Sequence, residues 1–106
     1  MGEAENKVQN EVSEYLTLLG FYFWRNNTGR RGKVSYGFKG SADFLGLLPS
    51  GRFLAVECKA PGKKQTTEQI EFQKNIETNK GLYILAYSVE DVKYGLQEGE
   101  DPQPTD

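Results

Sequence analysis

The chain has 106 residues, no histidine, one cysteine and a formal net charge of −2. This length predicts a single domain with a modest hydrophobic core. The absence of histidine excludes Ser-His-Asp and Cys-His catalysis, and with one cysteine it argues against a dedicated zinc site. Carboxylates and lysines must therefore perform any catalysis.

Cys58 cannot form an internal disulfide, which favours a reducing compartment. The sequence contains no apolar stretch long enough to span a membrane and no secretory signal pattern at its start. We therefore expect a cytoplasmic protein.

The first predicted element is an amphipathic helix over residues 3–19, followed by Gly20 as a stop signal. Residues 21–25 then predict a strand, residues 26–32 a mobile polar loop and residues 34–38 a short strand. The apolar positions of the helix recur every three or four residues: Val8, Val12, Leu16 and Leu19.

The second half of the chain predicts two clearer strands at about 43–48 and 52–59, joined by a turn at residues 48–52. A helix capped by Thr66 or Thr67 runs to about residue 79, a buried strand covers 82–87, and a short helix follows Ser88. The predicted order is α-β-(β)-β-β-α-β-α, an α/β or α+β domain over residues 1–97 with an acidic, disordered tail at 98–106. The inward positions of the two helices are Ile70, Phe72 or Gln73, Ile76, Val92 and Leu96.

Charged residues interrupt the two clearest strands. Asp43 begins the first strand, and Glu57 and Lys59 lie two positions apart in the second. Side chains at i and i+2 project from one face, whereas Val56 and Cys58 project from the other. A buried ionised Glu requires a compensating cation, and Mg²⁺ prefers one or two carboxylates with water and phosphate. The pattern predicts a metal site for phosphodiester hydrolysis.

The tripeptide Glu57-Cys58-Lys59 is a weak signal by itself, because a chain this rich in Glu and Lys contains about one E-x-K by chance. A second copy begins at Glu5, in the predicted first helix, where positions i and i+2 do not share a face. Only the copy at Glu57 follows an apolar strand, a glycine turn and an Asp-bearing strand. The alternative interpretation is an ordinary solvated strand end.

The net charge conceals local basic clusters. Four acids lie in the final residues 98–106, and without them 11 acids face 13 bases. Residues 25–39 contain five basic side chains and no acid, and a second basic cluster follows Glu57. Such clusters beside an acidic pocket suit a phosphate backbone, although a solvated loop is the alternative. The candidate DNA-binding residues are Arg25, Asn27, Arg30, Arg31, Lys33, Lys39, Lys63 and Lys64.

Several motifs occur in order between residues 5 and 96: Glu5-x-x-Val8-Gln9, Trp24-Arg25-Asn26-Asn27-Thr28-Gly29, Gly40-Ser41-Ala42-Asp43, Glu57-Cys58-Lys59, Thr66-x-x-Gln69-x-x-Phe72 and Ser88-Val89-Glu90-Asp91-Val92. Together they resemble the PD-(D/E)xK nuclease superfamily and, more narrowly, its stand-alone phage-type virus-type replication-repair nuclease (VRR-NUC) family. Two positions depart from the superfamily pattern. Ala42 stands in place of the usual proline, and Cys58 in place of an aliphatic residue.

The resemblance implies a restriction-endonuclease-like core, in which helices flank a central mixed sheet. It also implies Mg²⁺ or Mn²⁺ dependence and cleavage of DNA, often branched, by a homodimer in a bacterial or phage-infected cytoplasm. By position, Asp43 and Glu57 match the metal ligands, with the backbone carbonyl of Cys58 beside them. Lys59 matches the catalytic lysine, and Gln69 matches a glutamine on the following helix, with an ordinary surface glutamine as the alternative.

The first helix offers two candidates for a further acid of the site. Glu5 matches by its spacing to Val8 and Val12, and Glu11 is the fallback. The neighbouring aromatic residues at 22–24 offer either base stacking or core packing, and core packing is favoured for most of them.

The main functional hypothesis is a metal-dependent DNA endonuclease, selective for branched or Holliday-junction DNA. The alternative is a non-catalytic nucleic-acid-binding module that kept the fold, but such a module has no reason to retain acids that repel phosphate. A subunit of a restriction system or of a tailspike-associated assembly would differ in partner and not in chemistry. For a homodimer, segments 21–24 and 34–38 offer surfaces for pairing.

Overall fold

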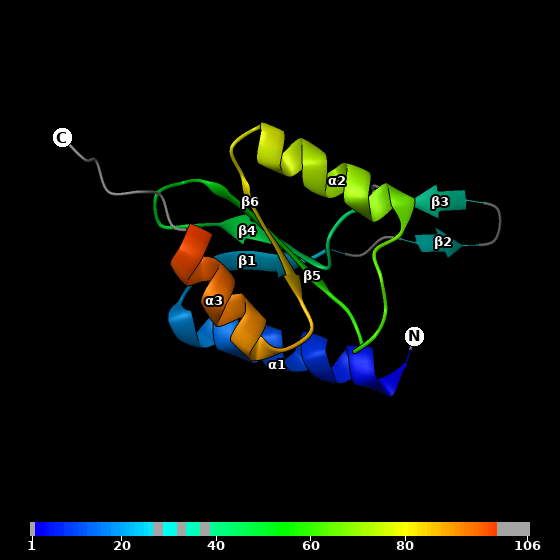
Figure 1. The fold of residues 1–106 in the computed structure, drawn as a ribbon, viewed down its shortest axis with the longest axis horizontal. Coiled ribbons are helices and arrows are strands. Elements are labelled where there is room, and N and C mark those ends of the chain that lie inside the picture. The colour runs from blue at the N-terminus through cyan, green and yellow to red at the C-terminus, as the bar shows by residue number, and fades with distance from the viewer. Residues whose placement is uncertain (1, 27–28, 32–33, 37–38, 100–106) are drawn as a thin grey trace.

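The computed structural model describes residues 2–26, 29–31, 34–36 and 39–99, with backbone only for 29–31 and 34–36. Figure 1 shows the arrangement of its elements. The helices are α1 (Glu3–Leu19), α2 (Thr67–Thr78) and α3 (Val89–Gly99). The strands are β1 (Tyr22–Arg25), β2 (Gly29–Arg31), β3 (Val34–Tyr36), β4 (Phe44–Leu47), β5 (Phe53–Cys58) and β6 (Leu82–Ala86).

Four strands form a mixed sheet in the order β1-β4-β5-β6. The β1–β4 and β4–β5 pairs are antiparallel, and β5 and β6 are parallel because α2 connects them as a crossover. The helices and the strands of this sheet follow one another as α-β-β-β-α-β-α. The predicted α+β fold is therefore confirmed.

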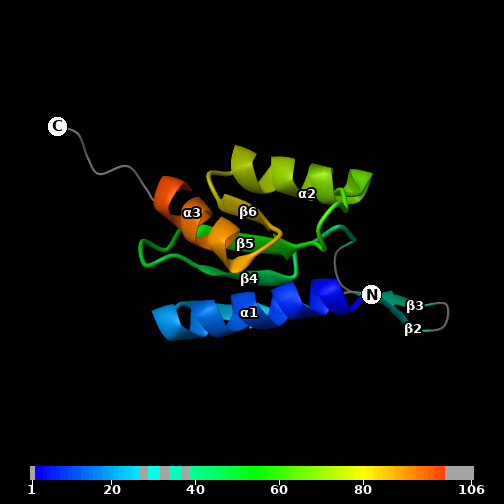
Figure 2. The ribbon, with the colours of Figure 1, turned by 60° about the horizontal axis from the view of Figure 1, so that its bottom comes forward.

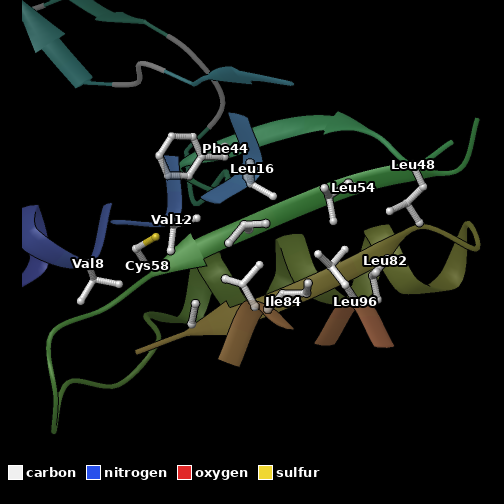
Figure 3. Packing of buried hydrophobic residues seen from close by; sticks show 13 residues of the cluster. Val8, Val12, Leu16, Phe44, Leu48, Leu54, Cys58, Leu82, Ile84 and Leu96 are labelled. Carbon is white, nitrogen blue, oxygen red and sulfur yellow. The ribbon is translucent and has the colours of Figure 1, made fainter. Parts of the chain in front are cut away.

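The helices cover opposite faces of the sheet. Figure 2 shows α1 and α2 on either side of the strands, and α3 packs with α1. The main core lies between the sheet and the α1–α3 layer, where the side chains in Figure 3 meet. Its helical members confirm most of the predicted apolar stripes: Val8, Val12, Leu16, Val92 and Leu96.

Strand β5 divides its side chains between the two faces. Leu54, Val56 and Cys58 are buried in the main core, whereas Ala55 belongs to a smaller cluster on the α2 face. Burying an aliphatic side chain of this size contributes about 1.5–3 kcal/mol. Because side chains alternate along a strand, the even-numbered residues of β5 pack in the main core. Glu57 therefore projects from the face that α2 partly covers.

Gly46 allows β1 and β4 to approach closely. It lies opposite Phe23, and a Cβ atom at Gly46 would come within 2.5 Å of the Tyr22 carbonyl oxygen and 2.7 Å of the Phe23 Cβ. No side chain larger than hydrogen fits at this crossing without moving the backbone. The missing side chain therefore fixes how β1 lies against the sheet.

Four sequence predictions were wrong. Residues 29–31 form β2, which pairs with β3 in a separate antiparallel hairpin and does not belong to a polar loop. Ile70 is 50% exposed because it lies on another side of α2 from Phe72 and Ile76, which pack on the sheet, and Leu19 is 44% exposed at the last residue of α1. Helix α3 continues through Glu98 and Gly99, which the sequence had assigned to the tail, whereas residues 100–106 lie outside the described residues.

The β2–β3 hairpin lies apart from the main sheet. Both views place it beyond the body of the molecule, at the end where α1 and α2 begin (Figures 1 and 2). None of the helices in the described part of the chain has the length and apolar character needed to cross a membrane.

Candidate active site

A cavity of about 490 Å³ opens where β4 begins and β5 ends, beside the first turns of α1 and α2. Sequence segments far apart in the chain contribute its walls. Its lining residues are Glu5, Gln9, Arg25, Asn26, Lys39, Gly40, Ser41, Asp43, Glu57, Lys59, Thr66, Glu68 and Gln69.

Asp43 and Glu57 face each other across β4 and β5. They lie one step beyond the paired residues Phe44 and Val56, so the antiparallel register places them directly opposite. The Cys58 backbone N–H donates to Asp43 Oδ2 at 2.8 Å, which holds this carboxylate against the end of β5. Burial raises the Asp43 pKa, although the Cys58 N–H opposes that shift.

Glu57 is only 3% exposed. Gln69 Nε2 donates to its Oε2 at 2.9 Å, but its buried Oε1 has no hydrogen-bond partner among the described residues. Burial, with repulsion from Asp43, raises the Glu57 pKa to about 8, and Lys59 opposes the shift. Because an ionised and half-satisfied carboxylate is costly at this depth, Glu57 requires a proton or a cation.

The residues fit a hard divalent cation. Asp43 and Glu57 supply two facing carboxylates, and Glu57 Oε1 is a buried oxygen without a partner in the described chain. No group of three or more His, Cys, Asp or Glu side chains suited to a metal occurs within the described ranges. Two carboxylates suffice for Mg²⁺, which retains water and phosphate ligands. The Cys58 thiol lies in the core, burial raises its pKa, and Cys58 is not among the lining residues of the cavity, so the thiol is no candidate ligand.

Gln69 has two structural roles. With Thr66 it forms a capping box: the Thr66 Oγ1 accepts from the Gln69 backbone N–H at 3.2 Å, and Gln69 Oε1 accepts from the Thr66 N–H at 2.9 Å. Its Nε2 remains free to donate to Glu57. The cap therefore fixes the amide orientation that presents a donor to the carboxylate, which is not the behaviour of an ordinary surface glutamine.

The first helix contributes Glu5 and not Glu11. Glu5 is half-buried and lines the cavity, whereas Glu11 is exposed and does not. The sequence assigned no role to Gln9, which is 2% exposed, donates to Glu5 Oε2 at 3.4 Å and accepts a hydrogen bond from the Arg25 guanidinium. The sequence signal for such a role is a polar residue beside Val8 on the apolar stripe, since a buried amide needs hydrogen-bond partners.

The segment at residues 39–41 closes the opposite side of the cavity. Gly40 has φ +82°, and a Cβ atom there would lie 2.4 Å from the Glu68 carbonyl oxygen. Asn26 Nδ2 donates to the Ala42 carbonyl at 3.0 Å and to Ser41 Oγ at 2.5 Å. Glycine at 40 thus permits this segment to pack directly on the first turn of α2.

The predicted DNA-binding residues fall into three groups. Arg25 and Lys39 line the cavity, and Lys39 lies 3.5 Å from Glu68 in an exposed ion pair. Lys63 and Lys64 are exposed on the loop after β5 and do not line the cavity. In the remaining group, Arg30 and Arg31 lie on β2 with only their backbone described, and Asn27 and Lys33 lie outside the described residues.

Comparisons with known proteins show a partial similarity. No known protein-family profile matches the chain. A stretch of 37 residues is 51% identical to "Putative nuclease p44" of Acyrthosiphon pisum secondary endosymbiont phage 1. The match covers 35% of this chain and 40% of that protein. Over about a third of its length, the chain is thus similar to a phage protein that bears a nuclease name.

Proposed function

We propose that this protein is a metal-dependent DNA endonuclease. The observation that supports the proposal best is the buried Glu57 carboxylate, which lies opposite Asp43 at the cavity and whose Oε1 lacks a partner among the described residues. The similarity to a phage protein with a nuclease name supports nuclease function in general. The metal and the DNA specificity belong to the proposal.

Asp43, Glu57 and the Cys58 backbone carbonyl would hold Mg²⁺ or Mn²⁺, which would supply a Lewis acid and an activated water. Among the described residues, three cations line the cavity: Lys39 pairs with Glu68, whereas Lys59 and Arg25 are suited to the charge that develops on the phosphoryl oxygens. The Lys59 backbone N–H donates to the Ala86 carbonyl at 2.9 Å, which fixes the start of its side chain. In the proposal Lys59 acts on the transition state and is not a ligand.

Two further residues hold this arrangement in place. Gln69 orients Glu57 by a direct hydrogen bond, and Gln9 connects Arg25 to Glu5. Gln69 and Glu5 therefore complete the proposed catalytic group with Asp43, Glu57 and Lys59. Preorganised groups of this kind accelerate phosphoryl transfer because they need not reorganise during the reaction.

The competing function is a non-catalytic nucleic-acid-binding module. The geometry disfavours it, because two carboxylates at the centre of the cavity would repel a phosphate unless a cation lay between them. A binding module would gain affinity from losing Asp43 and Glu57, whereas an enzyme would lose its activity.

We extend the proposal to branched DNA, including Holliday junctions, and to a homodimer. Symmetric cutting of a four-way junction needs two sites related by a two-fold axis, and one such cavity serves one strand. The basic residues of segment 25–39 would bind backbone phosphates without reading sequence. Light scattering at micromolar concentration tests the dimer independently of the nuclease activity.

The test of the proposed function uses labelled duplex, single-stranded, flapped and four-way-junction DNA, each with Mg²⁺, Mn²⁺ or EDTA. We expect cleavage with either metal, none with EDTA, and none with Glu57→Gln. Glu71→Gln, an exposed acid on α2, is the matched control and should cleave normally. Tighter DNA binding by Glu57→Gln, with no cleavage by the wild type under any condition, would instead establish the binding module.

A further inference from the structure

The α2 face of the sheet is covered over only part of its width. Phe72 and Ile76 of α2 pack near Ala55 and Tyr83. Toward the β1 edge, three large residues of this face are exposed: Tyr22 by 71%, Trp24 by 44% and Leu47 by 38%.

Two aromatic side chains dominate this exposed strip. Tyr22 pairs with Leu47 and Trp24 with Leu45, so all four project from the same face. The Tyr22 and Trp24 rings lie edge to face, with centroids 6.1 Å apart. Phe23, between them, turns to the other face and packs on the main core. The prediction that most of these three aromatic residues pack in the core was therefore wrong, because Phe23 does so whereas Tyr22 and Trp24 are exposed.

The strip leads directly into the cavity. Asp43 immediately precedes β4 and lies two positions before Leu45, so it projects from the same face about 7 Å further along. The ladder continues past β1, because the Asn26 N–H donates to the Asp43 carbonyl at 2.7 Å. Trp24 therefore occupies the row of the sheet next to the one that contains Asp43 and Glu57.

We propose that Tyr22 and Trp24 form a stacking platform for unpaired nucleobases beside the phosphate held in the cavity. Its placement beside the scissile phosphate rests on the proposed nuclease function. Aromatic rings bind bases by stacking regardless of sequence, and bases within an intact duplex are not available to them. The substrate class that fits this surface is DNA with single-stranded nucleotides next to the cleavage position.

The surroundings favour bases over a second protein chain. The cores of protein–protein interfaces are depleted of charged residues. Here the adjoining row contains two carboxylates, and Arg25 and the 83%-exposed Lys39 line the same cavity. Apolar rings next to cations match a nucleotide, which presents a ring and a phosphate together.

Trp24 is the single tryptophan of the chain, so its fluorescence reports on the platform directly. The probes are a ten-nucleotide oligo-dT and an abasic sugar–phosphate chain of equal length, both in EDTA so that no cleavage occurs. Oligo-dT should quench Trp24 and bind about 5- to 150-fold more tightly than the abasic chain. Equal affinity without quenching would overturn the proposal.

Matched variants separate stacking from general damage. Tyr22→Ala should weaken oligo-dT binding several-fold, whereas Tyr94→Ala, a 65%-exposed tyrosine on α3, should not. With labelled oligo-dT and anisotropy as the readout, Trp24→Phe should retain most of the affinity and Trp24→Ala should lose it. Equal losses from Tyr22→Ala and Tyr94→Ala would also overturn the proposal.

A dimer that Trp24→Ala dissociates, together with no quenching by oligo-dT, would show that a second copy of the chain covers this surface. That outcome overturns the platform. The experiments can also reject the stacking platform and the nuclease function independently of each other. Metal-dependent cleavage without quenching removes the platform and leaves the nuclease, whereas quenching without cleavage removes the nuclease and leaves the platform.

Discussion

The two faces of the four-stranded sheet differ in what they bury. Between the sheet and the α1–α3 layer lies a continuous apolar core, whereas the α2 face is partly covered and contains Asp43 and Glu57. Adjacent residues of one strand belong to opposite faces: Val56 is fully buried in the core, and Glu57 lines the cavity. One face can thus supply the stability that allows the other to keep a costly pair of carboxylates.

The largest expected effect comes from removing a carboxylate on the α2 face. Glu57→Gln and Asp43→Asn should each reduce metal-dependent cleavage by about 10³-fold or more, since each removes charge from the transition-state environment. Their urea midpoints should stay unchanged or rise, because the facing carboxylates repel each other. Cleavage assays and urea titrations measure both effects. A variant that cleaves at the wild-type rate would exclude that residue from the site.

A smaller loss should follow from Lys59→Met, which keeps the aliphatic stem and removes the charge. We expect the rate at saturating metal to fall about 10²-fold, while the metal concentration at half-maximal rate stays constant. Lys74→Met, at an exposed position of α2, is the control. If the metal dependence shifted and the saturated rate did not, Lys59 would belong to the metal environment and not to the transition state.

The opposite face should respond in stability alone. Val56→Ala removes two methyl groups from a fully buried position, which should lower the free energy of unfolding by about 2 kcal/mol. Cleavage per folded molecule should remain near the wild-type value. Urea unfolding measures the change in stability, and a cleavage assay at urea concentrations well below the unfolding transition measures the activity. A large loss of activity in the folded variant would mean that the faces are not independent.

The last effect, smallest when measured per pH unit, is a pH dependence of the stability of the metal-free protein. The folded-state pKa of Glu57 is about 8 against an ordinary 4.5, so the folded state binds the proton more tightly. Stability from this group is complete below about pH 4.5 and declines as pH rises to about 8, by at most about 1.4 kcal/mol per pH unit. Asp43 shifts in the same direction. Urea titrations in EDTA should show a shallower decline for Glu57→Gln, and identical slopes would contradict the assignment.

Most of the fold could be predicted because its signals are local. The period of α1, the alternation in β5 and the cap at Thr66 depend on neighbouring residues, and these elements lie where the sequence placed them. The strand at 29–31 was missed because its pairing with 34–36 depends on a partner and not on its own polar composition. Likewise, the exposure of Ile70 depends on which side of α2 packs on the sheet, and Phe72 and Ile76 take that position instead.

The candidate site divides in the same way. Asp43, Glu57 and Lys59 were identified because charged residues in apolar strands are conspicuous, and the structure brings all three to one cavity. Gln9 belonged to a quoted motif but received no role, because its partner Arg25 lies sixteen residues away in the sequence. Contacts between side chains of different elements are thus the part that sequence patterns did not reveal.

The double use of Gln69 couples local fraying to the chemistry of the cavity. The amide that begins α2 is also the amide that orients Glu57, so an opening of the first helical turn releases the carboxylate in the same event. Amide hydrogen exchange near Gln69 would therefore report how often the cavity loses its alignment, on a timescale that static geometry does not show. A metal that binds Glu57 would slow that exchange. Amide exchange at the start of α2 would therefore report metal binding in the cavity more simply than a turnover assay does.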